Sequence, residues 1–250
     1  MRWQRSAMLV ALLVLAAVSC TASVSPRAGG TAVTGSGVMA SDTRGLTGFT
    51  AVELRAVGNL DVERGGTTSI RIEADDNLLP HITTVVRQGV LVIDWAPGTG
   101  SVTTRHAITY HLSAPQALAA ATVHGAGAIH LGALQGDTVR LGVDGAGSIA
   151  VDAVQSTNLV ASIGGAGRIS AAGQARHQQL TIDGLGTYQA AGLATQQADV
   201  TITGAGHAQV RVSDALNATI DGVGSVQYAG TPRVTRHGTG LGQVIPMTTQ

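Results

Sequence analysis

The sequence has no lysine, very few aromatic residues and a single cysteine. Its 15 arginines balance 15 acidic residues, so the formal net charge is zero. Because the arginines are scattered along the chain, the sequence offers no basic patch of the kind that binds nucleic acid. One cysteine excludes an internal disulfide framework and any cysteine-based zinc site.

Aromatic residues make up only 2% of the chain, whereas hydrophobic residues make up 44%. A core must therefore be built from valine, isoleucine, leucine and alanine. Charged residues are 12% of the chain, and 34 of its 250 residues are glycine. This composition differs from that of a disordered chain, which combines high charge with few apolar residues.

Residues 1–19 have the order typical of a secretory signal peptide. Arg2 and Arg5 precede an uncharged, mostly aliphatic run at 7–18, and small residues follow it. The run is too short for a transmembrane span, which needs about 20 residues. We therefore predict an exported protein whose signal peptide ends at residue 19.

The only cysteine, Cys20, follows this segment directly. The stretch LAAVSC at 15–20 resembles a bacterial lipoprotein signal, although Ala17 stands where leucine is commonest. The resemblance implies cleavage before Cys20 and lipid attachment to it, so that the membrane becomes a partner through acyl chains. Thr21 is compatible with sorting to the outer membrane, on its surface or its periplasmic face. The alternative is an ordinary signal peptide that leaves Cys20 free or removes it.

The mature chain is predicted to begin with a tether. Residues 20–46 contain the cysteine and a stretch rich in serine, threonine, glycine and alanine without a hydrophobic period, so we expect a flexible linker. An all-β domain is predicted over 47–245. It has a strand-rich first part at 47–115 and, continuous with it, a repeat region at 116–245.

All three glutamates of the chain lie in the strand-rich part, at Glu53, Glu63 and Glu73. Glu53 is expected to pair with Arg55, two residues along the same exposed strand face. Glu73 is expected to pair with Arg71 in the same way. No Ser-His-Asp spacing or metal-binding pattern accompanies them, so we predict no catalytic residues.

One unit recurs from residue 121 onward. It consists of an alternating apolar strand, a Gly-x-Gly turn and a second alternating strand. Successive copies lie twenty positions apart, except that the step to the fourth copy is nineteen and the step to the sixth is eighteen. The first glycines of the six copies are Gly125, Gly145, Gly165, Gly184, Gly204 and Gly222. A degenerate seventh copy is expected at Gly238.

A single unit cannot bury its own aliphatic face, because it has only two short strands. Stacking of successive units buries a continuous core, which predicts an all-β fold of the β-solenoid class, resembling a β-helix. The Gly-x-Gly turns are expected to need glycine because the chain adopts positive φ there.

Polar residues recur near the turns. Aspartate precedes the turn in alternate copies, at Asp144, Asp183 and Asp221, which leaves open whether one coil holds one repeat or two. Stacked carboxylates could hold a cation, but Asp-Gly is also favourable turn chemistry, and we predict no metal site. Three histidines near turns match no ligand motif and are expected to be solvated: His124, His130 and His207. Arg168 occupies the same position after its turn as His207.

The strand pattern and the repeats together resemble the putative auto-transporter adhesin head GIN domain family over residues 46–245. The specific features are the start at Phe49 and Val52, the ADDNLL turn at 74–79, the GVLVI strand at 89–93 and the repeated Gly-x-Gly units. The resemblance implies an all-β, right-handed superhelix similar to pectin-lyase-type β-helices, and a bacterial surface or adhesion role. It supplies no catalytic residues.

These features favour a non-enzymatic lipoprotein of the cell envelope that binds a protein or glycan at the surface without a cofactor. A periplasm-facing scaffold is an alternative. A polysaccharide-active enzyme is less favoured, because glutamate is absent after Glu73 and only Tyr188 and Tyr228 in the repeats could offer an aromatic ring to a sugar. The open ends of a solenoid also leave assembly into a homo-oligomer open.

Overall fold

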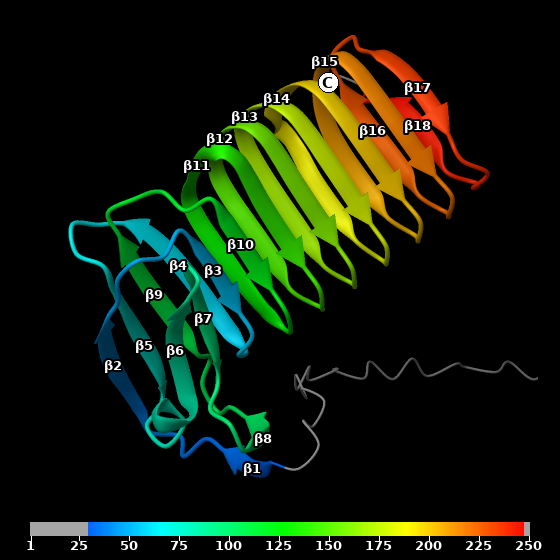
Figure 1. Ribbon diagram of the computed structural model, residues 1–250. Helices are drawn as coiled ribbons and strands as arrows, with labels where there is room; N and C mark the ends of the chain where they lie inside the picture. Colours follow the sequence, from blue (N-terminus) through cyan, green and yellow to red (C-terminus); the bar gives the residue numbers. More distant parts are fainter. Residues whose placement is uncertain (1–29, 248–250) are drawn as a thin grey trace, which may run out of the picture.

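Alternating aliphatic residues and Gly-x-Gly turns wind the chain into stacked coils, as the sequence predicts. The computed structural model describes residues 30–247, and these residues contain strands, turns and one short 3-10 helix but no α-helix (Figure 1). The predicted all-β solenoid is confirmed. No helix among the described residues is long and apolar enough to cross a membrane.

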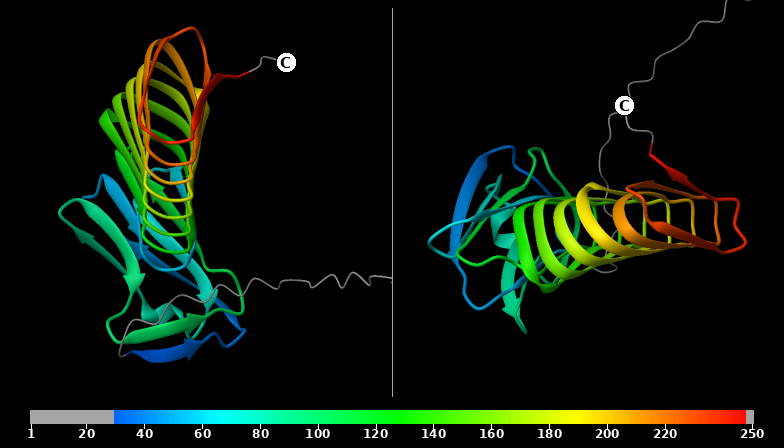
Figure 2. Two further views of the ribbon diagram at one scale, coloured as in Figure 1. Left: turned by 90° about the vertical axis from the view of Figure 1, so that its right-hand side faces the viewer. Right: turned by 90° about the horizontal axis from the view of Figure 1, so that it is seen from above.

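Five long strands build the regular part of the solenoid. Each runs from one Gly-x-Gly turn to the next and bends once, so its two halves lie on opposite faces of a flattened coil (Figure 2). Each pairs in parallel with the next. They are β11 (Gly127–Val143), β12 (Ser148–Ile163), β13 (Arg168–Ile182), β14 (Thr187–Ile202) and β15 (His207–Ile220).

Each coil holds one repeat. Ala128 of β11 pairs with Ser148 of β12, one repeat further along, and Val143 pairs with Ile163. The Gly-x-Gly turns of successive repeats therefore lie above one another along one edge. The doubled period of the aspartates does not reflect a coil of two units.

The stacking continues into the N-terminal part. β3 (Ala51–Leu54) pairs in parallel with β10 (Ala120–Val123), and β4 (Gly58–Arg64) pairs with β11. β7 (Val90–Trp95) and β9 (Thr109–Ala114) lie next to β3 and β4 in the same way, although they come later in the chain. The two parts of the domain are continuous, and the stacked coils begin with these strands rather than at residue 116.

Antiparallel strands close the N-terminal end. The 3-10 helix η1 (Leu79–His81) leads into β6 (Ile82–Arg87), which pairs with β7. On the other face, β5 (Ser69–Asp75) pairs with β9 and with β2 (Met39–Gly45). A separate two-stranded sheet joins β1 (Thr31–Thr34) to β8 (Thr99–Thr103).

The prediction of a flexible linker is wrong for residues 30–46, because β1 and β2 lie within them. The predicted turn after β5 holds this segment. The Ser36 hydroxyl donates to Asp76 Oδ1 at 2.5 Å, and the Asn77 side-chain amide donates to the Thr34 carbonyl at 2.8 Å. Hydrogen bonds to the turn thus fix a stretch whose composition favours disorder. Residues 20–29, with Cys20, lie outside the described part of the chain.

Asp75 anchors the same region from inside. Its side chain is fully buried, and its two oxygens lie 2.8 Å from His106 Nδ1 and 3.1 Å from the backbone nitrogen of Arg105. Burial raises the pKa of the Asp75 carboxyl, but these hydrogen bonds and the attraction to His106 outweigh it, so the pKa lies below its usual value. The ionised carboxylate therefore stabilises the closed end.

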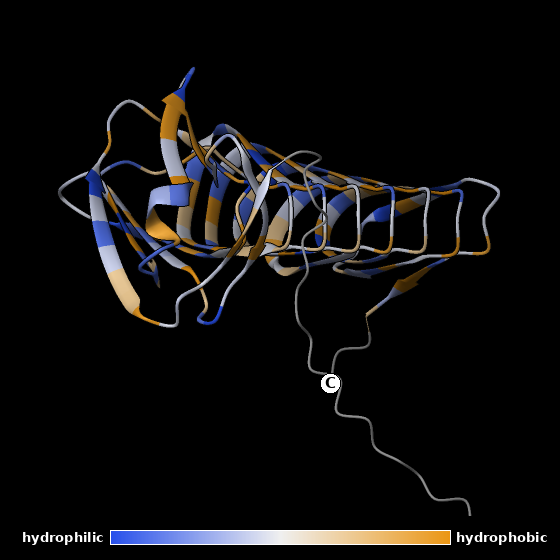
Figure 3. Ribbon diagram, turned by 90° about the horizontal axis from the view of Figure 1, so that it is seen from below, coloured by the Kyte–Doolittle hydropathy of each residue, from blue (hydrophilic) through white to orange (hydrophobic). Residues whose placement is uncertain are grey.

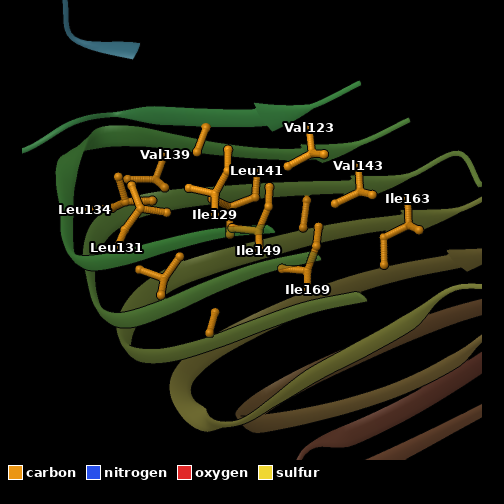
Figure 4. Packing of buried hydrophobic residues seen from close by; sticks show 14 of the residues in the cluster. Val123, Ile129, Leu131, Leu134, Val139, Leu141, Val143, Ile149, Ile163 and Ile169 are labelled. Atoms are coloured by element: carbon orange, nitrogen blue, oxygen red, sulfur yellow. The ribbon is translucent and has the colours of Figure 1, made fainter. Parts of the chain in front are cut away.

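Columns of aliphatic side chains fill the solenoid (Figure 4). Side chains in register on successive coils form each column, and all six in two neighbouring columns are at most 1% exposed: Val123, Val143 and Ile163 in one, Ile129, Ile149 and Ile169 in the other. Hydrophilic residues alternate with hydrophobic ones along the coils (Figure 3). The core is continuous from coil to coil, as the stacking of repeats requires.

The few aromatic residues serve mainly in packing. Tyr188 follows Ile169 in its column, is fully buried, and has the small Ala208 as its next neighbour. It is not exposed to a sugar, so its prediction as an available aromatic ring is wrong. The Tyr188 hydroxyl and the side-chain nitrogen and oxygen of buried Gln178 have no hydrogen-bond partner among the described residues.

The last coil consists of β16 (Ser225–Ala229), β17 (Arg233–His237) and β18 (Gln243–Pro246). A seventh repeat is present, but it starts at Gly240 rather than at the predicted Gly238. A Cβ on Gly240 would lie 2.2 Å from the carbonyl oxygen of Gly222, which shows that these two glycines stack. The predicted copy was therefore displaced by two positions.

Candidate functional site at the solenoid corners

Each coil has two corners, and the Gly-x-Gly corner is the tightly packed one. A Cβ on Gly184 would lie 2.3 Å from the carbonyl oxygen of Gly165, and one on Gly204 would lie 2.3 Å from that of Gly184. Neither Gly184 nor Gly204 has a positive φ, so the expected reason for glycine at these turns is wrong. Glycine is needed because successive backbones touch.

A polar column runs beside this corner. His124 Nδ1 lies 3.0 Å from Asp144 Oδ2, and the Thr203 hydroxyl donates to Asp183 Oδ1 at 2.6 Å. With one repeat per coil, the aspartates are two coils apart, about 10 Å at the usual strand spacing, which is too far to share a cation. The described residues contain no group of three or more histidine, cysteine, aspartate or glutamate side chains arranged to hold a metal ion.

The middle residue of the turn is exposed. It is alanine in most copies, but Leu185, Val223 and Leu241 are 68%, 65% and 84% exposed. Asp183 and Asp221 lie two positions before Leu185 and Val223, so carboxylates flank this apolar edge. Such a charge pattern disfavours insertion into an anionic membrane surface.

The opposite corner absorbs the changes in repeat length. The pairing of β11 with β12 has no register shift, but β13 is shifted against β12 between Val151 and Val154, where one residue is missing. β15 is shifted against β14 at two places, between Ala190 and Ala194 and between Thr195 and Gln197. The two shortened steps of the repeat therefore arise at this corner, and positive-φ glycines lie here, at Gly173 and Gly230.

An open groove of about 640 Å³ runs along this corner, across the coils from β12 to the segment before β17. We call it the corner groove. It is lined by Gln155, Ser156, Gln174, Ala175, Arg176, Ala194, Thr195, Gln196, Arg211, Val212, Ser213, Gly230 and Thr231. The lining contains two arginines and no carboxylate, and most of its residues have polar or charged side chains.

The two arginines of the corner groove are exposed. Neither Arg176 nor Arg211 uses its guanidinium group in a hydrogen bond or ion pair within residues 30–247. The Ser156 hydroxyl oxygen is buried and also lacks a partner there. The groove thus presents two free cationic groups beside amide and hydroxyl groups.

The histidines predicted near turns lie in separate places. His130 Nε2 lies 3.1 Å from Asp152 Oδ2, and His207 Nδ1 lies 2.6 Å from the Ser225 hydroxyl. Arg168 and His207 share a column through Thr187, as their common position predicts. Arg168 lines another hollow, of about 350 Å³, at the Gly-x-Gly corner.

The glutamates behave as the sequence predicts. Arg55 Nη2 lies 2.7 Å from Glu53 Oε2, and Arg71 Nη2 lies 2.5 Å from Glu73 Oε1. Glu53 and Arg55 lie on and next to β3, Arg71 and Glu73 lie on β5, and none of these four residues lines the corner groove.

No sequence motif predicts the corner groove. Its only trace in the sequence is the shortened step of the repeat before Gly184 and again before Gly222. That shortening was visible, but the sequence alone does not say which corner of a coil loses the residues.

A family model described as "Putative auto-transporter adhesin, head GIN domain" matches residues 48–232. A search of curated proteins gave no match. A solved structure of a putative adhesin from Bacteroides fragilis is 20% identical with a TM-score of 0.80, covering 86% of this chain and 100% of that one.

Two further structures share the fold. A putative adhesin from Parabacteroides merdae is 25% identical with a TM-score of 0.67, covering 87% of this chain and 99% of its own. A putative lipid binding protein from Parabacteroides distasonis is 17% identical with a TM-score of 0.72, covering 87% of this chain and 100% of its own.

Proposed function

Since this chain belongs to the putative auto-transporter adhesin, head GIN domain family, we propose that it is a non-enzymatic adhesion or binding protein at the bacterial cell surface. The observation that carries the proposal is the solenoid, which holds long exposed faces and the corner groove on a rigid hydrogen-bonded scaffold. Parallel pairing through every coil fixes the spacing of the exposed side chains, which suits recognition of an extended partner.

The proposal includes a lipid anchor at Cys20, which would hold the protein at the outer membrane. Cys20 lies ten positions before Gly30, where the described chain begins. A stretch of that length spans at most about 35 Å. β1 lies at the closed end and β17 and β18 at the far end (Figure 1), so an anchored chain would direct its last coils away from the membrane.

Treatment of intact cells with an external protease tests the surface location. Loss of the mature chain while a periplasmic marker stays intact would support adhesion at the surface. Protection that ends only when the outer membrane is permeabilised would overturn it and favour a periplasm-facing scaffold.

A Cys20→Ala variant tests the anchor separately. The variant is expected to leave the membrane fraction and appear in soluble fractions, because it lacks the sulfur that carries the acyl chain. If it stays in the membrane fraction to the same extent as the unaltered chain, the anchor is not at Cys20.

A further inference from the structure

We propose that the corner groove binds an acidic saccharide chain, with Arg176 and Arg211 contacting its acidic groups. This inference rests on the proposed surface-binding function and names the ligand class of that function.

The charge of the corner groove favours an anionic ligand. Arg176 and Arg211 are the only charged residues in its lining, and neither guanidinium group has a hydrogen-bond or ion-pair partner in the described part of the chain. Asp214 is the nearest acidic residue in sequence, and the Ser213 hydroxyl donates to its carboxylate at 2.5 Å. A planar guanidinium group binds a carboxylate or a sulfate with two parallel hydrogen bonds, so a uronic or sulfated sugar satisfies it better than a neutral one.

The uncharged part of the lining favours a sugar over other anions. Gln155 and Gln174 pair in register on neighbouring coils, and Gln196 and Thr231 lie further along the groove. Amide and hydroxyl side chains both donate and accept hydrogen bonds, as sugar hydroxyls do. Ser156 also lines the groove, and its hydroxyl oxygen is buried without a hydrogen-bond partner among the described residues.

The shape favours a chain of sugars. The lining comes from five successive coils, marked by Gln155, Gln174, Ala194, Arg211 and Gly230, and the groove is therefore about 19 Å long at the usual strand spacing. The two arginines lie two coils apart, about 10 Å along the axis. A ligand with acidic groups at intervals along a polymer can reach both.

The same features argue against a peptide or a lipid. The strands that line the groove are paired on both sides with neighbouring coils, so they leave no free edge for an added peptide strand. The apolar side chains in the lining are small, being alanine and valine, and offer little surface to an acyl chain.

The test uses the full chain carrying Cys20→Ala, and compares matched polymers that differ only in charge. Polygalacturonate is compared with its methyl ester, and dextran sulfate with dextran, by titration calorimetry at low and physiological salt. We expect binding of at least one acidic member, at least tenfold tighter than its neutral counterpart and weakened by salt.

The residues are tested with the double variant Arg176→Gln and Arg211→Gln. It is expected to weaken binding of the acidic polymer at least tenfold, because both free guanidinium groups are lost. Arg140→Gln is the matched control, since Arg140 is also exposed but lies on the flat face of β11, and it should change the affinity less than twofold. Unfolding curves of all variants should superimpose, because none of the three guanidinium groups forms a hydrogen bond or ion pair within residues 30–247.

Three results would overturn the inference: equal binding of charged and neutral polymers, an unchanged affinity in the double variant, or binding to phosphatidylglycerol vesicles without binding to either acidic polymer. The protease experiment on intact cells tests the proposed surface location independently of glycan binding. If the chain is exposed at the surface but does not bind acidic glycans, only the inference about the corner groove is overturned. If the chain is periplasmic but binds them, only the proposal of surface adhesion is overturned.

Discussion

The two corners of each coil are built from the same repeat but differ in how tightly successive coils pack. At the Gly-x-Gly corner, the N–H of the middle residue donates to the first glycine of the preceding coil, as Leu185 does to Gly165 and Ala205 to Gly184. Successive glycines touch, so neither an added side chain nor an added residue fits. At the opposite corner the register shifts from coil to coil. Backbone contact between coils fixes the length of the Gly-x-Gly corner. The opposite corner can vary in length, and the corner groove lies there.

The difference separates stability from recognition. The corner that repeats most faithfully in sequence is the one where backbones are closest, and it has little room for specific side chains. The corner whose length varies carries glutamines, arginines and threonines. The repeat alone points to the Gly-x-Gly turn as the place of function, yet the corner groove lies at the opposite corner.

The largest expected effect comes from adding one methyl group at the Gly-x-Gly corner. Gly184→Ala places a Cβ 2.3 Å from the Gly165 oxygen, and since the obstacle is backbone, we expect a loss of roughly 3 kcal/mol in the free energy of unfolding. Gly132→Ala is the control near the opposite corner, because a Cβ there meets no atom within 4 Å. It should change stability by less than about 0.5 kcal/mol. Denaturant titration of both variants decides whether close contact explains the glycines.

The next largest effect is expected from a two-residue insertion, which should destabilise the Gly-x-Gly corner more than the opposite corner. A Gly-Ser insertion between Gly204 and Ala205 separates two groups that bond to neighbouring coils and should cost roughly 2 kcal/mol. The same insertion between the exposed Ser213 and Asp214 extends a corner that already varies in length, and should cost less than about 1 kcal/mol. Equal losses in thermal unfolding at both sites would contradict the idea that one corner is free.

Replacement of a buried polar side chain is expected to have a smaller effect and to raise the free energy of unfolding. Gln178 is fully buried, and its amide atoms have no partner among the described residues, whereas its column neighbour on the preceding coil is Leu159. Replacing Gln178 by methionine keeps the volume and removes the unpaired amide, so stability should rise by about 1 kcal/mol. Gln179→Met, on the exposed face, is the control and should leave the unfolding midpoint almost unchanged.

The smallest effect concerns the flat face between the corners. Asp199 Oδ2 lies 2.7 Å from His177 Nε2, and Asn217 Nδ2 donates to Asp199 Oδ1 at 2.8 Å. Burial raises the pKa of Asp199, but the hydrogen bonds from Asn217 and His177 and the attraction to His177 lower it below its usual value. The carboxyl is half exposed, so solvent screens it and its contribution should stay below about 1 kcal/mol.

The pH dependence follows from that direction. Because the folded pKa of Asp199 lies below the unfolded value of about 3.9, its stabilisation is complete at higher pH and is lost as the pH falls through the folded pKa. Asp199→Asn should therefore destabilise slightly at pH 6, and the difference from the unaltered chain should shrink as the pH falls below the unfolded value. A difference that grows on acidification would reverse the assigned direction.

The sequence predicted the regular part well, because its signals are local. The correct predictions depend on neighbours along one strand or on the next copy of the repeat. They are the regular period of the repeats, the alternation around Leu141 and Ile149, and the pairs of Glu53 with Arg55 and Glu73 with Arg71. The prediction failed where distant segments meet. Nothing near residues 39–45 indicates that they pair with β5, and the hydrogen bonds that hold the segment before them come from Asn77, in a turn far along the chain.

The repeats alone are enough to predict a stacked β-solenoid with one glycine-lined corner, because a repeated two-strand unit can bury its aliphatic face only against copies of itself. Three features emerge only once the coils are stacked: how the solenoid is closed, at which corner a repeat is shortened, and therefore where the corner groove lies. These features depend on the register between strands of different coils, since the same gap in sequence can be taken up at either corner until the glycine contacts fix one of them.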